Sequence, residues 1–493
     1  MSKSTDLNVK VKFGVKSFIT VVIILLTVLI TVGVLTFVIP ASRYTVYTTD
    51  PDLAGQPFYQ YTENEDLNKQ IIIDSYRLLT KEENTSRLPV IRWFTSPVEA
   101  LIFGSNGMNM IMIIALLLVL GGTFKVLEES GGLISLVRVI MGKLHSKRFA
   151  VIWAITAVIM LLSAIFGLQE QLLILYPIFA MLCSALNWSH FTAISFVLIA
   201  SGVGFTTAIT NPWTIGAASI AAGVDVTDGL WYRLIIFAVM YVITSLFLVY
   251  LAKRDEKKAT EKFDIQTFTE EAEKDHEEDV RKSKMIILLF SIALLSVIVA
   301  TAIEALRGLA MVFMAVAFVV GTVIVGKLLL GSYKRLGKSF IVGVKDVLPS
   351  IAIIMIAFGI TYIAEEGNIL HTIFHYFYNL VTNISPYVAT IILYLFVLIV
   401  EFFIPSASAK AALIIPLLTL APIEGISKTV IILTYLFADG YTNVLYPTCG
   451  TLLVGLGLAN ISLSEWFKKT ILFQLLLMVI SIGFLMLAIA IGL

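Results

Sequence analysis

Residues 401–457 are EFFIPSASAKAALIIPLLTLAPIEGISKTVIILTYLFADGYTNVLYPTCGTLLVGLG, two long apolar segments that are each interrupted near the middle. Polar residues mark both interruptions: Ser406, Ser408 and Lys410 in the first, Asp439 and Asn443 in the second. Interrupted helices are costly in hydrocarbon because their freed backbone groups have no water to bond. Transporters accept this cost where the interruption lines a binding site at mid-membrane. The stretch therefore predicts part of a substrate site.

A similar pair of interruptions occurs earlier in the chain, GLQEQLLILYP at residues 167–177 and TTAITNPWTIG at residues 206–216. The two halves also share GTFKVLEE at residues 122–129 and GITYIAEE at residues 359–366, each followed by an amphipathic segment. One copy is expected to begin outside the membrane and the other inside, which makes the repeat inverted. Inverted repeats with paired broken helices are typical of alternating-access carriers.

Composition sets the class of protein. The chain has 493 residues, of which 58% are hydrophobic and 14% are charged, with a mean hydropathy of +0.93. Such values predict an all-α polytopic membrane protein. The net charge of +1 argues against a nucleic-acid partner. No Walker-type phosphate loop is present, so we expect no ATP, no other cofactor and no metal site, with proton or sodium coupling left open.

The predicted organisation has six parts. They are an N-terminal transmembrane helix (1–40), an external loop (41–95), a first inverted repeat (96–252), a cytoplasmic linker (253–284), connecting helices (285–345) and a second inverted repeat (346–493). The external loop has strand character around YTVYTT and IIIDSY.

Basic residues set the orientation. Lysines before the first span place the N-terminus in the cytoplasm, and the charged linker belongs on the same side. Residues 149–166 and 170–185 could each cross the membrane or could form one re-entrant hairpin. Only the hairpin leaves the linker in the cytoplasm, so we predict two re-entrant hairpins, two broken transmembrane helices and an external C-terminus.

Eleven polar residues at the interruptions are candidate ligands of substrate or ion, because polar groups within membrane segments mark functional sites. They are Glu170, Gln171, Thr207, Thr210, Asn211, Ser406, Ser408, Lys410, Asp439, Asn443 and Thr448. At the first break, it is an equally good interpretation that the polar residues only stabilise the helix kink around Pro212. Four glutamates at helix ends are interpreted instead as membrane-edge anchors: Glu128, Glu129, Glu365 and Glu366.

Lys410 needs a negative partner at mid-depth, because an unpaired ammonium there costs about 2.5–3.5 kcal/mol. Asp439 and Glu401 are the available acids, and a purely structural ion pair is the competing interpretation. Glu170, Asp439 and Lys410 sum to −1 when all are ionised, which suits a cationic or zwitterionic substrate better than a dianion.

Five motifs together resemble the YfcC/DcuC-type carriers of the ion transporter superfamily: VIPASRY, GLQEQ, TNPWTIGAASIAAG, IPSASAKA and FADGYTNVLYPTCG. That group includes proteins described as arginine/ornithine antiporters and as anaerobic four-carbon-dicarboxylate carriers. The resemblance covers nearly the whole chain. The family pattern has two glutamates at the first tip, where this chain has Glu170 and Gln171. It has an amide at the second tip, where this chain has Lys410.

The resulting hypothesis is a multi-pass secondary transporter of the inner cell membrane and not an enzyme. We expect an antiporter of amino acids, with basic ones such as arginine and ornithine favoured. A dicarboxylate carrier is the alternative, and an intramembrane hydrolase using Ser406 or Ser408 with Lys410 is a remote one. The expected partners are a small-molecule substrate and the lipid bilayer, and a homodimer is left open.

Overall fold

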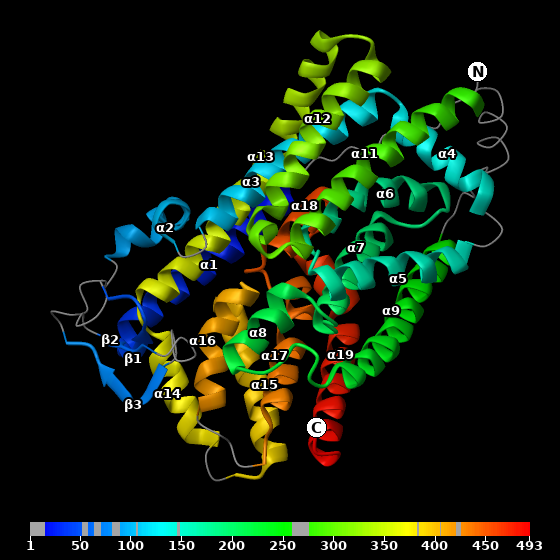
Figure 1. Cartoon of the computed structure of the whole chain (residues 1–493). Helices are drawn as coiled ribbons and strands as arrows, with labels where there is room; N and C mark the ends of the chain where they lie inside the picture. The colour runs from blue at the N-terminus through cyan, green and yellow to red at the C-terminus, as the bar shows by residue number, and fades with distance from the viewer. Residues whose placement is uncertain are drawn as a thin grey trace.

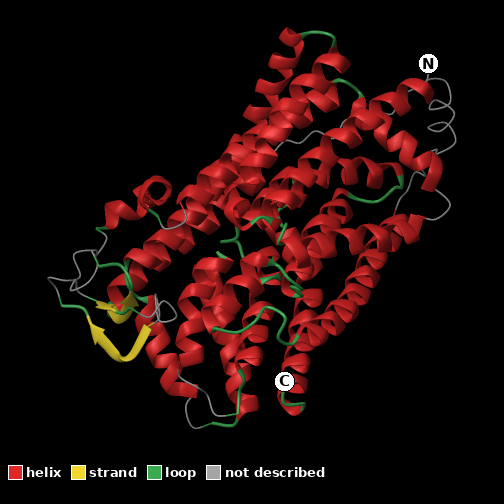
Figure 2. Cartoon of the chain, in the orientation of Figure 1, coloured by secondary structure: helices red, strands yellow, loops and turns green. Residues whose placement is uncertain are grey.

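The computed structural model describes residues 15–51, 58–63, 71–80, 89–104, 107–144, 148–258, 276–381, 384–404, 406–420 and 425–493. Figure 2 shows that nearly all of these residues are helical. Within the described part, seven helices have the length and apolar composition of a membrane span, or eight if the bent helix α13 (Tyr333–Glu366) is counted as one. The prediction of a polytopic helical membrane protein is therefore confirmed.

One group of helices, here called the scaffold bundle, runs along the upper left flank of the molecule in Figure 1. Its members are α1 (Val15–Val38), α2 (Val90–Phe103), α3 (Gly107–Glu129), α11 (His276–Ala302), α12 (Ala310–Leu330) and α13, with a short 3-10 turn, η5 (Glu304–Leu309), between α11 and α12. The helix α4 (Gly132–Leu144) follows α3 and packs against α11. Two members of the bundle, α3 and α13, form one wall of the central cavity described below.

Two elements of the scaffold bundle differ from the sequence-based expectation. α2 overlaps the last six residues of the predicted external loop and continues past Pro97, a residue that is unfavourable inside a helix. α13 begins at Tyr333, so the predicted boundary between residues 345 and 346 falls inside a helix. The basic residues near its start, Lys334 and Arg335, are part of the helix, since lysine and arginine are good helix formers.

A three-stranded sheet follows the first helix, at the lower left in Figure 1. Its strands are β1 (Ser42–Thr48), β2 (Tyr59–Tyr61) and β3 (Ile71–Leu78), in the order β2-β1-β3. β1 is parallel to β2 and antiparallel to β3. The sheet is attached to α14 (Leu370–Val381), because the Thr372 hydroxyl lies 2.7 Å from the Ser42 hydroxyl. The predicted strand character of the loop is therefore confirmed.

The first hairpin consists of α5 (Arg148–Phe166), the 3-10 turn η3 (Glu170–Leu175) and α6 (Tyr176–Ala185). Its two ends bind one carboxylate at the end of α9 (Leu230–Lys258). Arg148 Nε donates to Glu256 Oε1 at 2.8 Å, and Trp188 Nε1 donates to the same oxygen at 3.1 Å. The segment thus folds back to the end of the molecule where α9 ends, which we call the linker end. Its depth in a membrane stays a prediction.

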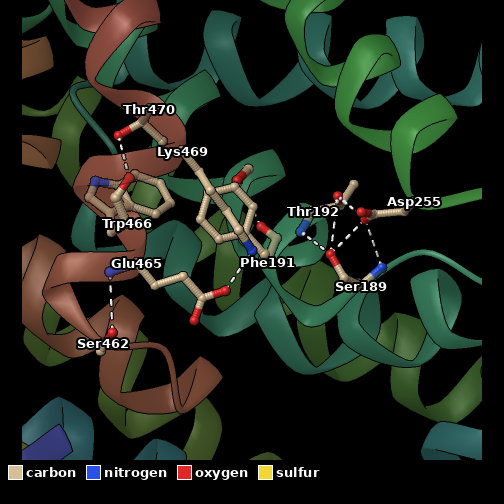
Figure 3. A network of polar contacts seen from close by, with 10 residues as sticks. Ser189, Phe191, Thr192, Asp255, Ser462, Glu465, Trp466, Lys469 and Thr470 are labelled. Atoms are coloured by element: carbon tan, nitrogen blue, oxygen red, sulfur yellow. Dashed lines mark hydrogen bonds and ion pairs between the residues drawn. The ribbon is translucent and has the colours of Figure 1, made fainter. Parts of the chain in front are cut away.

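The first broken helix consists of α7 (His190–Thr206), the π-helical turn η4 (Pro212–Gly216) and α8 (Ala217–Ala222). It begins at the linker end, where Asp255 Oδ2 accepts hydrogen bonds from the Ser189 backbone N–H at 2.9 Å and from the Thr192 hydroxyl at 2.6 Å (Figure 3). It finishes at the opposite end, where Lys428 Nζ donates to the Ala222 carbonyl at 2.7 Å. This opposite end is called the C-terminal end, because Leu493 lies there.

The second half of the chain repeats these elements. The second hairpin consists of α15 (Pro386–Phe403) and α16 (Ala407–Leu420), and the second broken helix consists of α17 (Lys428–Asp439), the turn η6 (Tyr441–Val444) and α18 (Gly450–Ala459). Gly425 packs against Pro386, so the second hairpin also returns to the end from which it starts. The chain finishes with α19 (Leu463–Ala490).

The two broken helices run in opposite directions. α17 begins at the C-terminal end, where the Ser427 hydroxyl donates to the Leu493 carbonyl at 2.5 Å. The residues that follow α18 lie at the linker end, where Lys469 Nζ sits 4.3 Å from the centre of the Phe191 ring, near the start of α7 (Figure 3). Antiparallel broken helices are the geometry that an inverted repeat requires.

Candidate functional site

The tip of the first hairpin lies at the centre of the molecule and contacts both broken helices. Gly167 begins the tip with a φ of +70°, and a Cβ there would overlap the side chain of Asn211 in the first break. Only glycine combines this backbone conformation with such a close approach. The next residues, Gln169 and Glu170, bind the second broken helix. Asn443 Nδ2 donates to Gln169 Oε1 at 3.1 Å, and the Thr451 hydroxyl donates to Glu170 Oε1 at 3.0 Å.

The first break is stabilised by its own polar residues. The backbone N–H groups of Ile209 and Asn211 donate to the Ala164 carbonyl of α5, at 2.8 and 3.1 Å. Asn211 Oδ1 accepts from the Trp213 N–H at 2.9 Å and caps the π-helical turn. The Thr207 hydroxyl donates to the Val203 carbonyl at 3.0 Å. These contacts replace the hydrogen bonds that the interruption frees.

Lys410, at the tip of the second hairpin, is completely buried between two carboxylates. Its Nζ contacts Asp439 Oδ1 at 2.5 Å and also contacts Glu401 Oε2, and neither acid has any exposed side-chain surface. Each member of this group, here called the buried triad, comes from a different element: α15, α16 and α17. Both acids that the sequence offered as partners of Lys410 therefore bind it. The triad carries a formal charge of −1 when all three groups are ionised.

A central cavity of about 240 Å³ lies between these tips and the scaffold bundle. Its lining includes five of the predicted site residues: Glu170, Gln171, Ser406, Asn443 and Thr448. Five others lie outside this lining: Thr207, Thr210, Asn211, Lys410 and Asp439. The side chain of Ser408 lies outside the described part of the chain. A ligand role for residues outside the lining stays a prediction.

Sequence reasoning missed the other wall of the cavity. α3 contributes Lys125 and Glu128, α13 contributes Asp346 and Thr361, and the first tip adds Gln169. Glu128 was interpreted as a membrane-edge anchor, but it lines the cavity, because α3 turns this face toward the hairpin tips. A signal was present in the spacing. Gly121 and Lys125 are one helical turn apart, as are Gly343 and Asp346, and small residues mark close helix crossings in membranes.

The electrostatics of the cavity differ from the sequence-based charge count. Among its lining residues three are acidic (Glu128, Glu170 and Asp346) and one is basic (Lys125), which gives a formal charge of −2. Lys125 Nζ forms an ion pair with Glu128 at 3.1 Å. Glu170 and Asp346 are the lining carboxylates that have no ion-pair partner among the described residues. The count made from the sequence summed Glu170, Asp439 and Lys410, but Asp439 and Lys410 lie outside the cavity lining and pair with each other in the buried triad.

Two folded-back hairpins that meet two antiparallel broken helices at a central cavity are the arrangement of alternating-access transporters. A family model described as "C4-dicarboxylate anaerobic carrier" matches residues 18–490. The chain belongs to this family of membrane transporters. The family resemblance inferred from the motifs is thereby confirmed.

Two relatives show how far the similarity extends. The chain is 25% identical over 447 residues to a protein of Escherichia coli (strain K12) named "Putative basic amino acid antiporter YfcC", which covers 83% of this chain and 86% of that one. It is 22% identical over 365 residues to an uncharacterized protein of Haemophilus influenzae, with 72% and 71% covered.

Two solved structures are also similar. The Alcanivorax borkumensis YdaH transporter is 14% identical, with a TM-score of 0.43 and 97% of this chain and 98% of that chain covered. Neisseria gonorrhoeae MtrF is 14% identical, with a TM-score of 0.41 and 95% and 94% covered.

Proposed function

We propose that this transporter is an antiporter of amino acids that favours basic ones such as arginine and ornithine. The observation that carries the proposal is the excess of carboxylates in the central cavity, where Glu170 and Asp346 have no lysine or arginine partner among the described residues. An unpaired acidic group in a poorly hydrated site favours a cationic ligand. The name of the Escherichia coli relative gives independent support for the same substrate class.

A dicarboxylate carrier is the second candidate, and the description of the family favours it. A dianion would need cationic groups in the cavity. Lys410 lies outside the cavity lining and forms ion pairs with Glu401 and Asp439, and Lys125 forms an ion pair with Glu128, so neither ammonium group is free for a dianion. The buried triad also counts against a hydrolase, because Ser406 lines the cavity whereas Lys410 contacts the two carboxylates instead.

The orientation in the inner cell membrane is part of the same proposal. We expect the N-terminus and the 253–284 linker in the cytoplasm and Leu493 outside.

A single cysteine in place of Thr267, which lies outside the described residues, is expected to react with a membrane-impermeant thiol reagent only from the cytoplasmic side. Cysteine in place of the exposed Glu63 is the matched control and should react only from outside. The native cysteines, Cys183 and Cys449, are buried and leave a low background. Labelling of Thr267→Cys from outside alone would contradict both the hairpins and the inverted repeat.

The substrate class is tested by uptake into proteoliposomes. The panel contains arginine, ornithine, neutral amino acids and four-carbon dicarboxylates, with sodium and proton gradients varied separately. We expect uptake of the basic amino acids and no dependence on ATP. A carrier that takes up only dicarboxylates would contradict the proposal and would favour the second candidate.

A further inference from the structure

The scaffold side of the central cavity is built by a close crossing of α3 and α13. A Cβ on Gly121 would lie 2.7 Å from the Gly343 carbonyl oxygen, so the two backbones touch at this point. Because residues three or four positions apart share a helix face, this crossing directs Lys125 and Asp346 to the same side as the two glycines. Both residues line the cavity, as do residues of the first hairpin tip.

Asp346 is the acidic group of this wall that lacks a partner. Lys125 is paired with Glu128 at 3.1 Å, and among the described residues no hydrogen bond or ion pair reaches the Asp346 carboxylate. Lys345, its neighbour in the chain, is exposed and lies outside the cavity lining. The wall thus offers a single uncompensated carboxylate to whatever occupies the cavity.

A second observation points to a ligand between this wall and the hairpin tip. Gln169 lines the cavity with only 1% of its surface exposed, and its Nε2 has no hydrogen-bond partner among the described groups. A buried donor without a partner is costly, and a bound acceptor such as a carboxylate would satisfy it. Glu170, beside it, is an acceptor for an ammonium group. The tip therefore offers complementary groups to both charged ends of an amino acid backbone.

From this arrangement we infer that Asp346 is the specificity-determining residue of the scaffold wall, where it binds the cationic end of a basic amino acid side chain. The backbone carboxylate of the substrate binds Gln169, and its ammonium group binds Glu170. A cavity of about 240 Å³ is below the range for drug-sized ligands and suits one small molecule of this kind. The inference rests on the proposed function and extends it to the group that distinguishes basic from neutral substrates.

The test compares arginine with citrulline, which has nearly the same shape but carries a neutral urea in place of the guanidinium. In proteoliposomes, Asp346→Asn is expected to lower kcat/KM for arginine by about ten- to a hundredfold, the range for one hydrogen bond to a charged group. Transport of citrulline should change little. The expected effect on arginine lies mainly in KM. Lys345→Gln, one residue along the same helix, is the control and should leave both substrates unaffected.

The outcomes separate this inference from the proposed function. If Asp346→Asn transports arginine with an unchanged preference over citrulline, the role of Asp346 is contradicted while basic amino acid transport stands. If both substrates lose transport equally, Asp346 acts on structure and not on specificity, which also overturns the inference. If the wild-type protein transports neither compound, the proposed function itself fails. Thermal unfolding of the purified variant distinguishes a misfolded protein from an inactive one.

Discussion

Replacing Lys410 with glutamine is expected to lower the thermal unfolding midpoint and the folded yield of the carrier sharply. The change leaves Glu401 and Asp439 facing each other without a counter-ion, although both are completely buried. Removing one partner of a buried ion pair typically costs about 3–5 kcal/mol, because the remaining charge is uncompensated. The measurement is thermal unfolding of the detergent-purified variant beside the wild type.

Two further variants make this result interpretable. Lys469→Gln is the matched control, because Lys469 pairs with Glu465 at 2.5 Å on a partly exposed helix surface. Pairs of that kind contribute only about 0.3–0.5 kcal/mol. The neutral triple variant Lys410→Met, Glu401→Gln, Asp439→Asn should recover much of the lost stability, since uncharged replacements of a buried ionic group are often tolerated. A Lys410→Gln protein as stable as the control would contradict this account of the buried triad.

The same variant bears on ion coupling. The family resemblance of the motifs implies an uncharged amide at the position of Lys410, a residue suited to a site that takes its cation from solution. We propose that the fixed ammonium of Lys410 replaces that cation, so that this carrier works without sodium. Lys410→Gln should then transport poorly in sodium-free buffer and recover in part when sodium is added. Wild-type uptake that requires a sodium gradient would contradict the idea, and Lys410 would remain a structural partner of the two acids.

Replacing Glu170 with glutamine is expected to lower transport by about a hundredfold while leaving the protein folded. Glutamine keeps an oxygen that can accept the hydrogen bond from Thr451, so the tip of the hairpin should retain its structure. The negative charge that receives the substrate ammonium is lost, together with a charge-assisted hydrogen bond. Because every amino acid has this ammonium group, arginine and citrulline should lose transport alike. That pattern differs from the one expected for Asp346→Asn.

Transport kinetics and thermal unfolding of Glu170→Gln are the measurements that check this prediction. Glu465→Gln is the control, because this acid lies near the start of α19, where its backbone N–H binds Ser462, and it is not part of the cavity lining. It should transport at nearly the wild-type rate. Transport by Glu170→Gln at the rate of this control would show that the carboxylate at the first tip is dispensable.

The sequence was sufficient to predict the hairpins and the breaks. Proline, glycine, serine and asparagine within apolar segments indicate an interrupted helix. The charge of the linker favoured hairpins over full crossings, and the number of crossings stays a prediction. The ionic partners of Lys410 were also predictable, because few acids lie at comparable positions in apolar segments. These inferences depend on local chemistry and on side-chain charge, which a single sequence displays directly.

The roles of individual polar residues were harder to predict. Asn211 and Asn443 both lie at a break. Asn211 Oδ1 accepts a hydrogen bond from the Trp213 backbone N–H, whereas Asn443 Nδ2 donates to Gln169 and the residue lines the cavity. A sequence does not distinguish a side chain that satisfies its own backbone from one that faces a ligand. Asp346 was missed for a different reason: its role depends on which faces of α3 and α13 meet the hairpin tips, a property of the tertiary packing.

Counterflow between arginine and ornithine tests the central claim most directly. Proteoliposomes loaded with unlabelled ornithine and held without any ion gradient are given labelled arginine outside. An antiporter of basic amino acids should accumulate the label transiently, in exchange for internal ornithine, with equal rates in the presence and absence of sodium. Vesicles that contain no ornithine should take up little. If internal ornithine does not accelerate arginine uptake, while an internal four-carbon dicarboxylate accelerates dicarboxylate uptake, the account of this cavity as a site for basic amino acids is wrong.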